Sequence, residues 1–126
     1  MTDAKPREHR LSVPRSARCF SWGGEAAAEA WAVLHGYGQL ASRFLRGFES
    51  IATPTRLVVA PEGLSRFYLD AGAGKVGASW MTKEDRAHEI EDYLSYLEQV
   101  RAAIIPPVAL TILGFSQGVA TAARWA

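Results

Sequence analysis

The chain has 126 residues, of which 48% are hydrophobic, and a formal net charge of +1. This length and composition predict one folded domain with a real core and exclude a chain that is disordered throughout. The near-zero net charge argues against a nucleic-acid partner bound through phosphate contacts. The single cysteine, Cys19, excludes an intramolecular disulfide.

The N-terminal segment differs in composition from the rest of the chain. Residues 5–18 are basic and contain prolines, which predicts a solvated tail over residues 1–16, with a binding arm as the alternative. The folded domain is then expected over residues 17–126. The sequence shows neither an apolar secretory signal nor an apolar run long enough to span a membrane, so we expect a cytoplasmic protein.

The first half of the chain predicts strands and one helix. Residues 17–22 are aromatic and apolar and stop at two glycines, which indicates a first strand. Residues 31–35 form a nearly continuous apolar run, as in a strand buried on both faces. Residues 40–48 place apolar side chains on one helical face, and residues 56–63 form the next buried strand.

The second half begins with an irregular stretch. Residues 64–80 predict a long loop, and such loops inside compact domains are usually functional or disordered. Thr82 and Asp85 have the spacing of a helix capping pair, which opens a long predicted helix. Residues 108–113 predict another buried strand, followed by a last helix. Buried strands alternating with helices predict an α/β fold with a mostly parallel sheet and flanking helices.

Gly72, Gly74 and Gly77 have the spacing of a dinucleotide-binding loop. That motif needs a strand before it and a helix that starts within it. Here the preceding residues make a weak strand pattern, and the predicted helix waits until Thr82. We therefore interpret the glycines as a flexible loop, with nucleotide binding as the alternative.

The stretch LGFSQG (113–118) runs from the last predicted strand into a Gly-x-Ser-x-Gly turn. Such a turn holds a serine nucleophile, because Gly114 and Gly118 let the backbone fold tightly and expose the hydroxyl of Ser116. The alternative is a serine in an ordinary strand-to-helix turn. The chemistry also needs two backbone N–H donors for the developing oxyanion, one of them from Gln117.

The stretch LHGYG (34–38) follows a buried strand and supplies a loop for the second donor. We expect this donor to be the N–H of Tyr37. His35 and Gly36 are then expected to support the loop, with the His35 ring packed beneath it. The competing interpretation makes His35 the base for Ser116, which requires its ring within hydrogen-bonding distance of the hydroxyl.

Three separated segments together resemble a known family. VLHGYGQ is similar to the oxyanion loop, and LGFSQG to the nucleophile elbow, of the phospholipase/carboxylesterase group of α/β-hydrolases, which includes acyl-protein thioesterases. GASWMTKEDRAHEIEDYLSYLEQV (77–100) resembles the segment that leads into the helix before the nucleophile strand of small bacterial members. The resemblance covers most of residues 17–126 in the right order.

This resemblance implies a hydrolase of carboxylic esters or thioesters that forms an acyl-serine intermediate on Ser116. Tyr37 and Gln117 would form the oxyanion hole, and Trp80 and Phe115 would line the substrate pocket. The implied partner is a small-molecule ester or a lipid-like substrate. No cofactor and no metal are implied.

Members of the group carry a triad aspartate and histidine after the serine, and the ten residues that follow Ser116 contain neither. We therefore expect an incomplete α/β-hydrolase domain, truncated after the elbow and its following helix, whose activity alone is very low. The alternative is a non-catalytic truncated domain that binds an acyl ligand or a partner. Residues 108–113 would then present an unpaired apolar edge, through which we expect the chain to self-associate.

Overall fold

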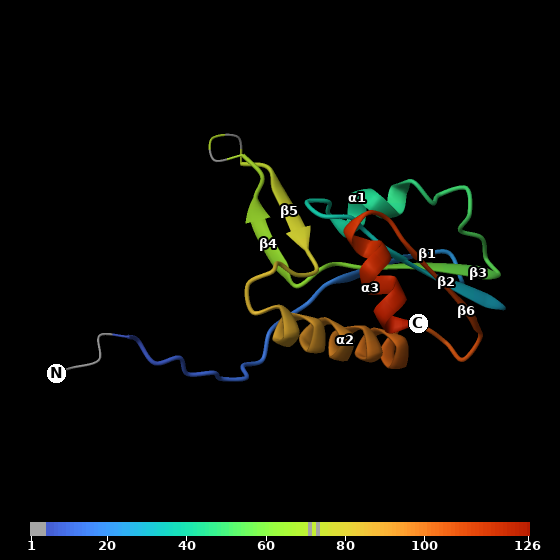
Figure 1. The fold of residues 1–126 in the computed structure, drawn as a ribbon. Helices are drawn as coiled ribbons and strands as arrows, with labels where there is room; N and C mark the ends of the chain where they lie inside the picture. Colours follow the sequence, from blue (N-terminus) through green and yellow to red (C-terminus); the bar gives the residue numbers. More distant parts are fainter. Residues whose placement is uncertain (1–4, 71, 73) are drawn as a thin grey trace.

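A four-stranded sheet organises the computed structural model, which describes residues 5–70, 72 and 74–126 (Figure 1). In spatial order its strands are β1 (Cys19–Trp22), β3 (Arg56–Pro61), β2 (Glu29–Leu34) and β6 (Ala109–Gly114). Strand β2 pairs in parallel with both β3 and β6, and β1 pairs antiparallel with β3. The predicted mostly parallel sheet is confirmed.

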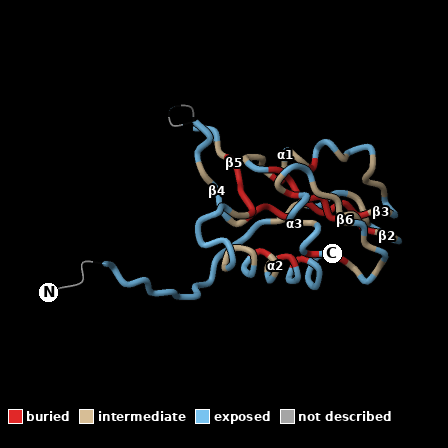
Figure 2. Tube along the Cα trace, in the orientation of Figure 1, coloured by how far each residue is buried: buried red, intermediate tan, exposed pale blue. Residues whose placement is uncertain are grey.

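Helices cover both faces of this sheet, as expected of an α/β fold. They are α1 (Ala41–Arg46), α2 (Arg86–Ala103) and α3 (Gln117–Trp125). Because side chains alternate along a strand, Ala32 packs in the core cluster with α2 and α3, while Val33 packs with α1. Figure 2 shows the buried residues gathered between these layers. The buried residues of α2 are Tyr93, Leu97 and Val100, which recur at helical spacing and form its apolar stripe.

The stretch predicted as a long irregular loop holds a β-hairpin instead. Strands β4 (Ser65–Tyr68) and β5 (Val76–Ser79) pair antiparallel. Residues 38 and 39 extend this hairpin, because Gly38 N–H donates to Ala78 O (2.8 Å) and Ala78 N–H donates to Gln39 O (3.0 Å). The order of the hairpin thus comes from pairing with a distant segment, which the local sequence pattern does not reveal.

The hairpin also accounts for the glycine spacing at Gly72, Gly74 and Gly77. Gly77 lies in β5, where a Cβ atom would stand 2.7 Å from the Cα of Gly38. Helix α2 starts well after the motif, so the described residues do not form the strand–glycine–helix geometry that a dinucleotide needs. The predicted flexible loop falls partly on residues 71 and 73, which lie outside the described residues.

Helix α2 begins later than the capping pair predicts. Its N-cap is Asp85, in the left-handed region at φ 56°, and its first helical residue is Arg86. Thr82 instead accepts the Glu84 N–H on its hydroxyl (3.2 Å), which also lies 3.3 Å from Glu89 Oε1. The predicted capping role of Thr82 is wrong, because Glu89 and a local turn occupy its hydroxyl.

Strand β6 is less buried than predicted. Its residues alternate between exposed and half-buried, with Ala109 and Thr111 exposed. The reason is its place at the edge of the described sheet, where it pairs with β2 alone. One row of its backbone groups therefore has no partner strand in the described residues.

The described part of the N-terminal segment lies outside the helices and strands. Residues 5–18 are exposed and form neither helix nor strand (Figure 2). Arg10 of this segment forms an ion pair with Asp85 at 2.6 Å. None of the helices in the described residues is long and apolar enough to cross a membrane. The cytoplasmic location stays a prediction.

Candidate active site

Three polar residues follow the carboxyl ends of neighbouring parallel strands. His35 comes directly after β2, Glu62 directly after β3, and Ser116 two residues after the end of β6. The carboxyl ends of parallel strands meet at one edge of a sheet, which is where ligands bind in open α/β sheets. The fold thus brings these three residues to the same edge.

Ser116 occupies a strained turn between β6 and α3. Its backbone has φ 55° and ψ −118°, a region that residues other than glycine rarely adopt and that recurs at functional sites. A Cβ atom on Gly114 would stand 2.7 Å from Val119 N, and one on Gly118 would stand 2.7 Å from His35 O. The turn therefore needs glycine on both sides of the serine.

The loop after β2 packs directly on this turn. A Cβ atom on Gly36 would lie 3.0 Å from the Cβ of Ser116 and 3.1 Å from Cδ2 of Phe115. Gly36 N–H donates to Oε1 of Gln39 (2.6 Å), which holds the loop in a tight turn. The two segments that the sequence analysis singled out are therefore in contact.

Two backbone N–H groups at this contact stand out by their lack of partners. Gly38 and Gln39 donate theirs to Ala78 O and Gly36 O, but neither Tyr37 nor Gln117 donates its N–H to any residue that the structure describes. These are the two donors predicted for the oxyanion hole. Their convergence on one point beside Ser116 stays a prediction.

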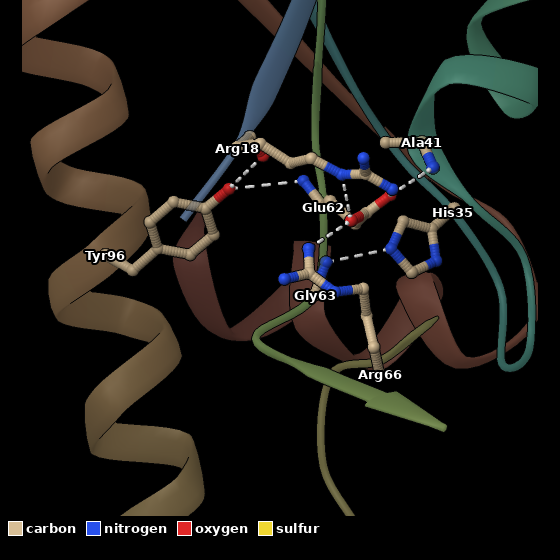
Figure 3. A network of polar contacts seen from close by, with 7 residues as sticks. All are labelled: Arg18, His35, Ala41, Glu62, Gly63, Arg66 and Tyr96. Carbon is tan, nitrogen blue, oxygen red and sulfur yellow. Dashed lines mark hydrogen bonds and ion pairs between the residues drawn. The ribbon is translucent and has the colours of Figure 1, made fainter. Parts of the chain in front are cut away.

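His35 is fully buried, and both of its ring nitrogens are engaged. Figure 3 shows its contact with Gly63. Gly63 N–H donates to Nε2 (2.9 Å), so Nδ1 carries the proton that it donates to Gly36 O (2.8 Å). Burial lowers the pKa of His35, which keeps the ring neutral. The hydrogen bonds of the ring thus hold the start of the loop after β2 in place.

Trp80 also packs against this histidine. Its ring stacks on His35 with centroids 5.0 Å apart, and its Nε1–H donates to His35 O (2.9 Å). Trp80 is only 2% exposed. These contacts place Trp80 against the start of the loop after β2. Its predicted role in lining a substrate pocket stays a prediction.

Glu62 is a buried carboxylate that the sequence analysis did not single out (Figure 3). It is 1% exposed and receives hydrogen bonds from Arg18 Nε (2.6 Å), Arg66 (3.1 Å) and the N–H of Ala41 (3.1 Å). Burial acts to raise the pKa of Glu62, but these donors outweigh it and hold the pKa below its ordinary value. The signal available in the sequence was an acidic residue directly after a buried strand.

The side chain of Gln117 ties the serine turn to the segment after β5. Its Oε1 accepts the Trp80 N–H (2.9 Å), and its Nε2 donates to Met81 O (2.7 Å) and to Ser79 Oγ (3.1 Å). Gln117 therefore contributes to the site in two ways. Its side chain fixes the turn, and its backbone N–H has no partner among the described residues.

A pocket of about 500 Å³ lies beside the loop after β2. Its lining combines apolar side chains with two cations, and it includes Leu40, Arg43, Phe44, Leu69, Lys75 and Val76. The Phe115 ring, 55% exposed, lies 6.3 Å from the ring of Phe44 and so connects the serine turn with this pocket. A pocket of this volume falls within the range of sites that bind small organic ligands.

The chain's single thiol is not a second nucleophile. Cys19 is half-buried, and burial raises its pKa to about 11, so it is protonated at neutral pH. Among the residues that the structure describes, no group of three or more His, Cys, Asp and Glu side chains could hold a metal ion.

The sequence matches no family model and no curated protein, but solved structures resemble the fold. Acyl-protein thioesterase 2 of Zea mays is 19% identical with a TM-score of 0.64, over 87% of this chain and 51% of that one. Esterase PE8 is 22% identical with a TM-score of 0.57, over 90% and 57%. A phospholipase/carboxylesterase of Dyadobacter fermentans is 17% identical with a TM-score of 0.58, over 92% and 56%.

The chain thus spans little more than half the length of these solved structures. At such low identity the likeness speaks for the fold, and it agrees with the mostly parallel sheet and its flanking helices. The chain therefore has a fold of the α/β-hydrolase type, as the resemblance of its sequence implies.

Proposed function

We propose that this chain is part of a serine hydrolase of the phospholipase/carboxylesterase type, acting on carboxylic esters or thioesters through an acyl intermediate on Ser116. The observation that carries this proposal is the strained turn at Ser116, packed against a glycine loop. The N–H groups of Tyr37 and Gln117, both without a partner among the described residues, support it. The names of the three solved structures supply the class of substrate.

In this mechanism the hydroxyl of Ser116 attacks the ester carbonyl. The negative charge that develops on the carbonyl oxygen is stabilised by the N–H groups of Tyr37 and Gln117. The tetrahedral intermediate collapses with loss of the alcohol or thiol, and water then releases the acid from the serine. The pocket beside Phe44 is the proposed site for the acyl or leaving group.

Proton transfer needs a base, and the described histidines do not supply one. His35 has both ring nitrogens engaged, His9 lies in the exposed N-terminal segment, and His88 binds Asp85 at 2.9 Å. The proposed mechanism therefore takes its serine and its oxyanion donors from the described residues, but these residues hold no histidine that can act as its general base. A serine hydroxyl without a base is a weak nucleophile.

We expect negligible turnover of p-nitrophenyl acetate by the 126-residue chain. Slow single acylation should still occur at Ser116, because oxyanion stabilisation alone leaves a rate roughly 10³-fold above the uncatalysed reaction. Peptide mapping by mass spectrometry after long incubation should find the acetyl group on Ser116, and Ser116→Ala should lack it. His35→Gln should leave turnover negligible.

Two outcomes would contradict these expectations. Acetylation confined to lysines, with none on Ser116, would overturn the nucleophile and favour the alternative, a non-catalytic domain that binds an acyl ligand. Robust turnover abolished by both Ser116→Ala and His35→Gln would instead make His35 the base.

We further propose that this chain associates with itself through the edge of β6. A strand edge of unpaired backbone groups is a template for another chain, and a lysine on the edge opposes such pairing. Light scattering should show concentration-dependent association that Thr111→Lys reduces. Ser50→Lys adds the same charge at an exposed position away from the sheet and should leave association unchanged. A monodisperse monomer at all concentrations would refute the proposal.

A further inference from the structure

A second pocket, of about 300 Å³, lies between α3 and residues 81–86. From α3 it is lined by Gln117, Ala120, Thr121 and Arg124, which recur at helical spacing along one face. The rest of the lining consists of Met81, Thr82, Lys83 and Arg86. None of these lining residues belongs to the proposed oxyanion machinery except Gln117.

The pocket concentrates positive charge in a chain whose net charge is only +1. Lys83, Arg86 and Arg124 line it together with no acidic residue. Lys83 and Arg86 form no ion pair with any described carboxylate. Arg124 donates to neutral groups, the hydroxyl of Tyr93 (2.9 Å) and Sδ of Met81 (3.7 Å).

Two of the neighbouring carboxylates are engaged by other groups, and Glu84, which follows Lys83, forms no ion pair with any described residue. Asp85 binds Arg10 (2.6 Å) and His88 (2.9 Å). Glu89 accepts the N–H of Thr82 at 3.3 Å. The positive charge of the pocket is therefore not neutralised from within the described residues.

A buried hydroxyl without a partner lies in the same lining. Thr121 is 1% exposed, and its Oγ1 makes no hydrogen bond with any described residue. A buried hydroxyl left unpaired costs free energy, so such groups are rare unless a ligand or water satisfies them. An anion bound in contact with Oγ1 of Thr121 would accept this hydrogen bond and meet the three cations.

We propose that this pocket binds a phosphate monoester group, held by Lys83, Arg86 and Arg124 with a hydrogen bond from the hydroxyl of Thr121. A phosphate monoester carries close to two negative charges at neutral pH and several acceptor oxygens, which suits three cationic donors better than a carboxylate does. The pocket volume leaves room for a small organic group on the phosphate. This inference stands independently of the proposed hydrolase activity.

The pocket shares a wall with the serine turn. The side chain of Gln117 lines the pocket and also binds Ser79, Trp80 and Met81. A phosphate bound against Met81 and α3 would thus contact the same segment that holds the turn. The pocket lies apart from the chamber beside Phe44, with which it has no lining residue in common.

The test is a titration of the intact chain with inorganic phosphate, followed by amide chemical shifts in nuclear magnetic resonance. We expect saturable shifts at Lys83 and Thr121. Lys83→Gln combined with Arg86→Gln should weaken binding about tenfold or more, as the loss of charge-assisted hydrogen bonds predicts. The matched control, Arg43→Gln with Lys75→Gln, removes two cations from the other pocket and should leave the phosphate affinity unchanged.

Thr121→Val tests the hydroxyl separately from the charge. It replaces an unpartnered buried hydroxyl by a methyl of the same shape, so it should keep or raise the stability of the fold. The same variant should weaken phosphate binding several-fold. Unsaturable shifts at millimolar phosphate, or equal weakening by the two charge-removing double variants, would overturn the proposal.

Two further ligands distinguish the sources of the phosphate group. Glycerol 3-phosphate represents a soluble ester, and phosphatidylcholine vesicles containing phosphatidic acid represent a lipid head group. Binding of glycerol 3-phosphate supports a soluble ligand, and binding of the vesicles alone supports a lipid. Binding of either ligand should be lost in the double variant that combines Lys83→Gln with Arg86→Gln. Binding that this variant retains would count against the pocket.

Discussion

Gly118→Ala should destabilise the protein strongly. The new Cβ atom would stand 2.7 Å from His35 O and still closer to Leu34 O, and both atoms belong to the backbone at the end of β2. A backbone carbonyl cannot rotate away as a flexible side chain can, so α3 must move from the sheet. We expect the free energy of unfolding to fall by about 3 kcal/mol, at the upper end for overpacking.

Urea denaturation followed by tryptophan fluorescence measures this loss, with Gly72→Ala as the matched control. A Cβ atom on Gly72 meets nothing within 4 Å among the described residues, so this alanine should leave the stability unchanged or slightly raised. Gly114→Ala should resemble Gly118→Ala, because its Cβ atom would stand 2.7 Å from Val119 N. Equal stability of Gly118→Ala and the parent would show that the turn is not closed in this way.

The tight turn at Ser116 could be foreseen because its requirements are local. A buried strand, two glycines around a serine and a following helix all lie within a short stretch of sequence, and spacing alone indicates the turn. The apolar stripe of α2 is equally local, since Tyr93, Leu97 and Val100 recur at helical spacing. Such structures can be predicted from sequence because the residues that specify them lie in the same short segment that forms them.

The features that escaped sequence analysis depend on distant partners. The hairpin of β4 and β5 is completed by Gln39, which is far away in the chain. Glu62 is held by Arg18 from 44 positions earlier. The apolar pattern of residues 108–113 predicted a strand buried on both faces, but burial also depends on the neighbours that the sheet provides. Pairing and burial of this kind are tertiary properties, and no local spacing reports them.

Glu62→Gln should lower the free energy of unfolding by about 2 kcal/mol at neutral pH, the loss typical of hydrogen bonds to a charged group. The carboxylate is 1% exposed and accepts hydrogen bonds from Arg18, Arg66 and the N–H of Ala41. Arg18 and Arg66 are 47% and 39% exposed, so water can solvate them once the charge is gone. The loss should therefore stay below the figure of about 3–5 kcal/mol for breaking a fully buried pair.

The pH dependence of this loss identifies its cause. The pKa of Glu62 is lower in the folded protein than its ordinary value, which is about 4.3 for a glutamate in an unfolded chain. Its contribution to stability is therefore fully present above about pH 5 and fades as the pH falls through the folded pKa. The difference in stability between the parent and Glu62→Gln should be constant near neutral pH and shrink towards zero in acid.

Glu49→Gln is the matched control for this measurement, because Glu49 is exposed. It should change neither the stability nor its pH profile. Hydrogen exchange adds a local readout, since the N–H of Ala41 loses a charged acceptor in Glu62→Gln and should exchange faster than in Glu49→Gln. A stability difference between the parent and Glu62→Gln that persists unchanged in acid would mean that the carboxylate acts through its shape and not its charge. In that case the ion pairs with Arg18 and Arg66 would not account for the stabilising effect of Glu62.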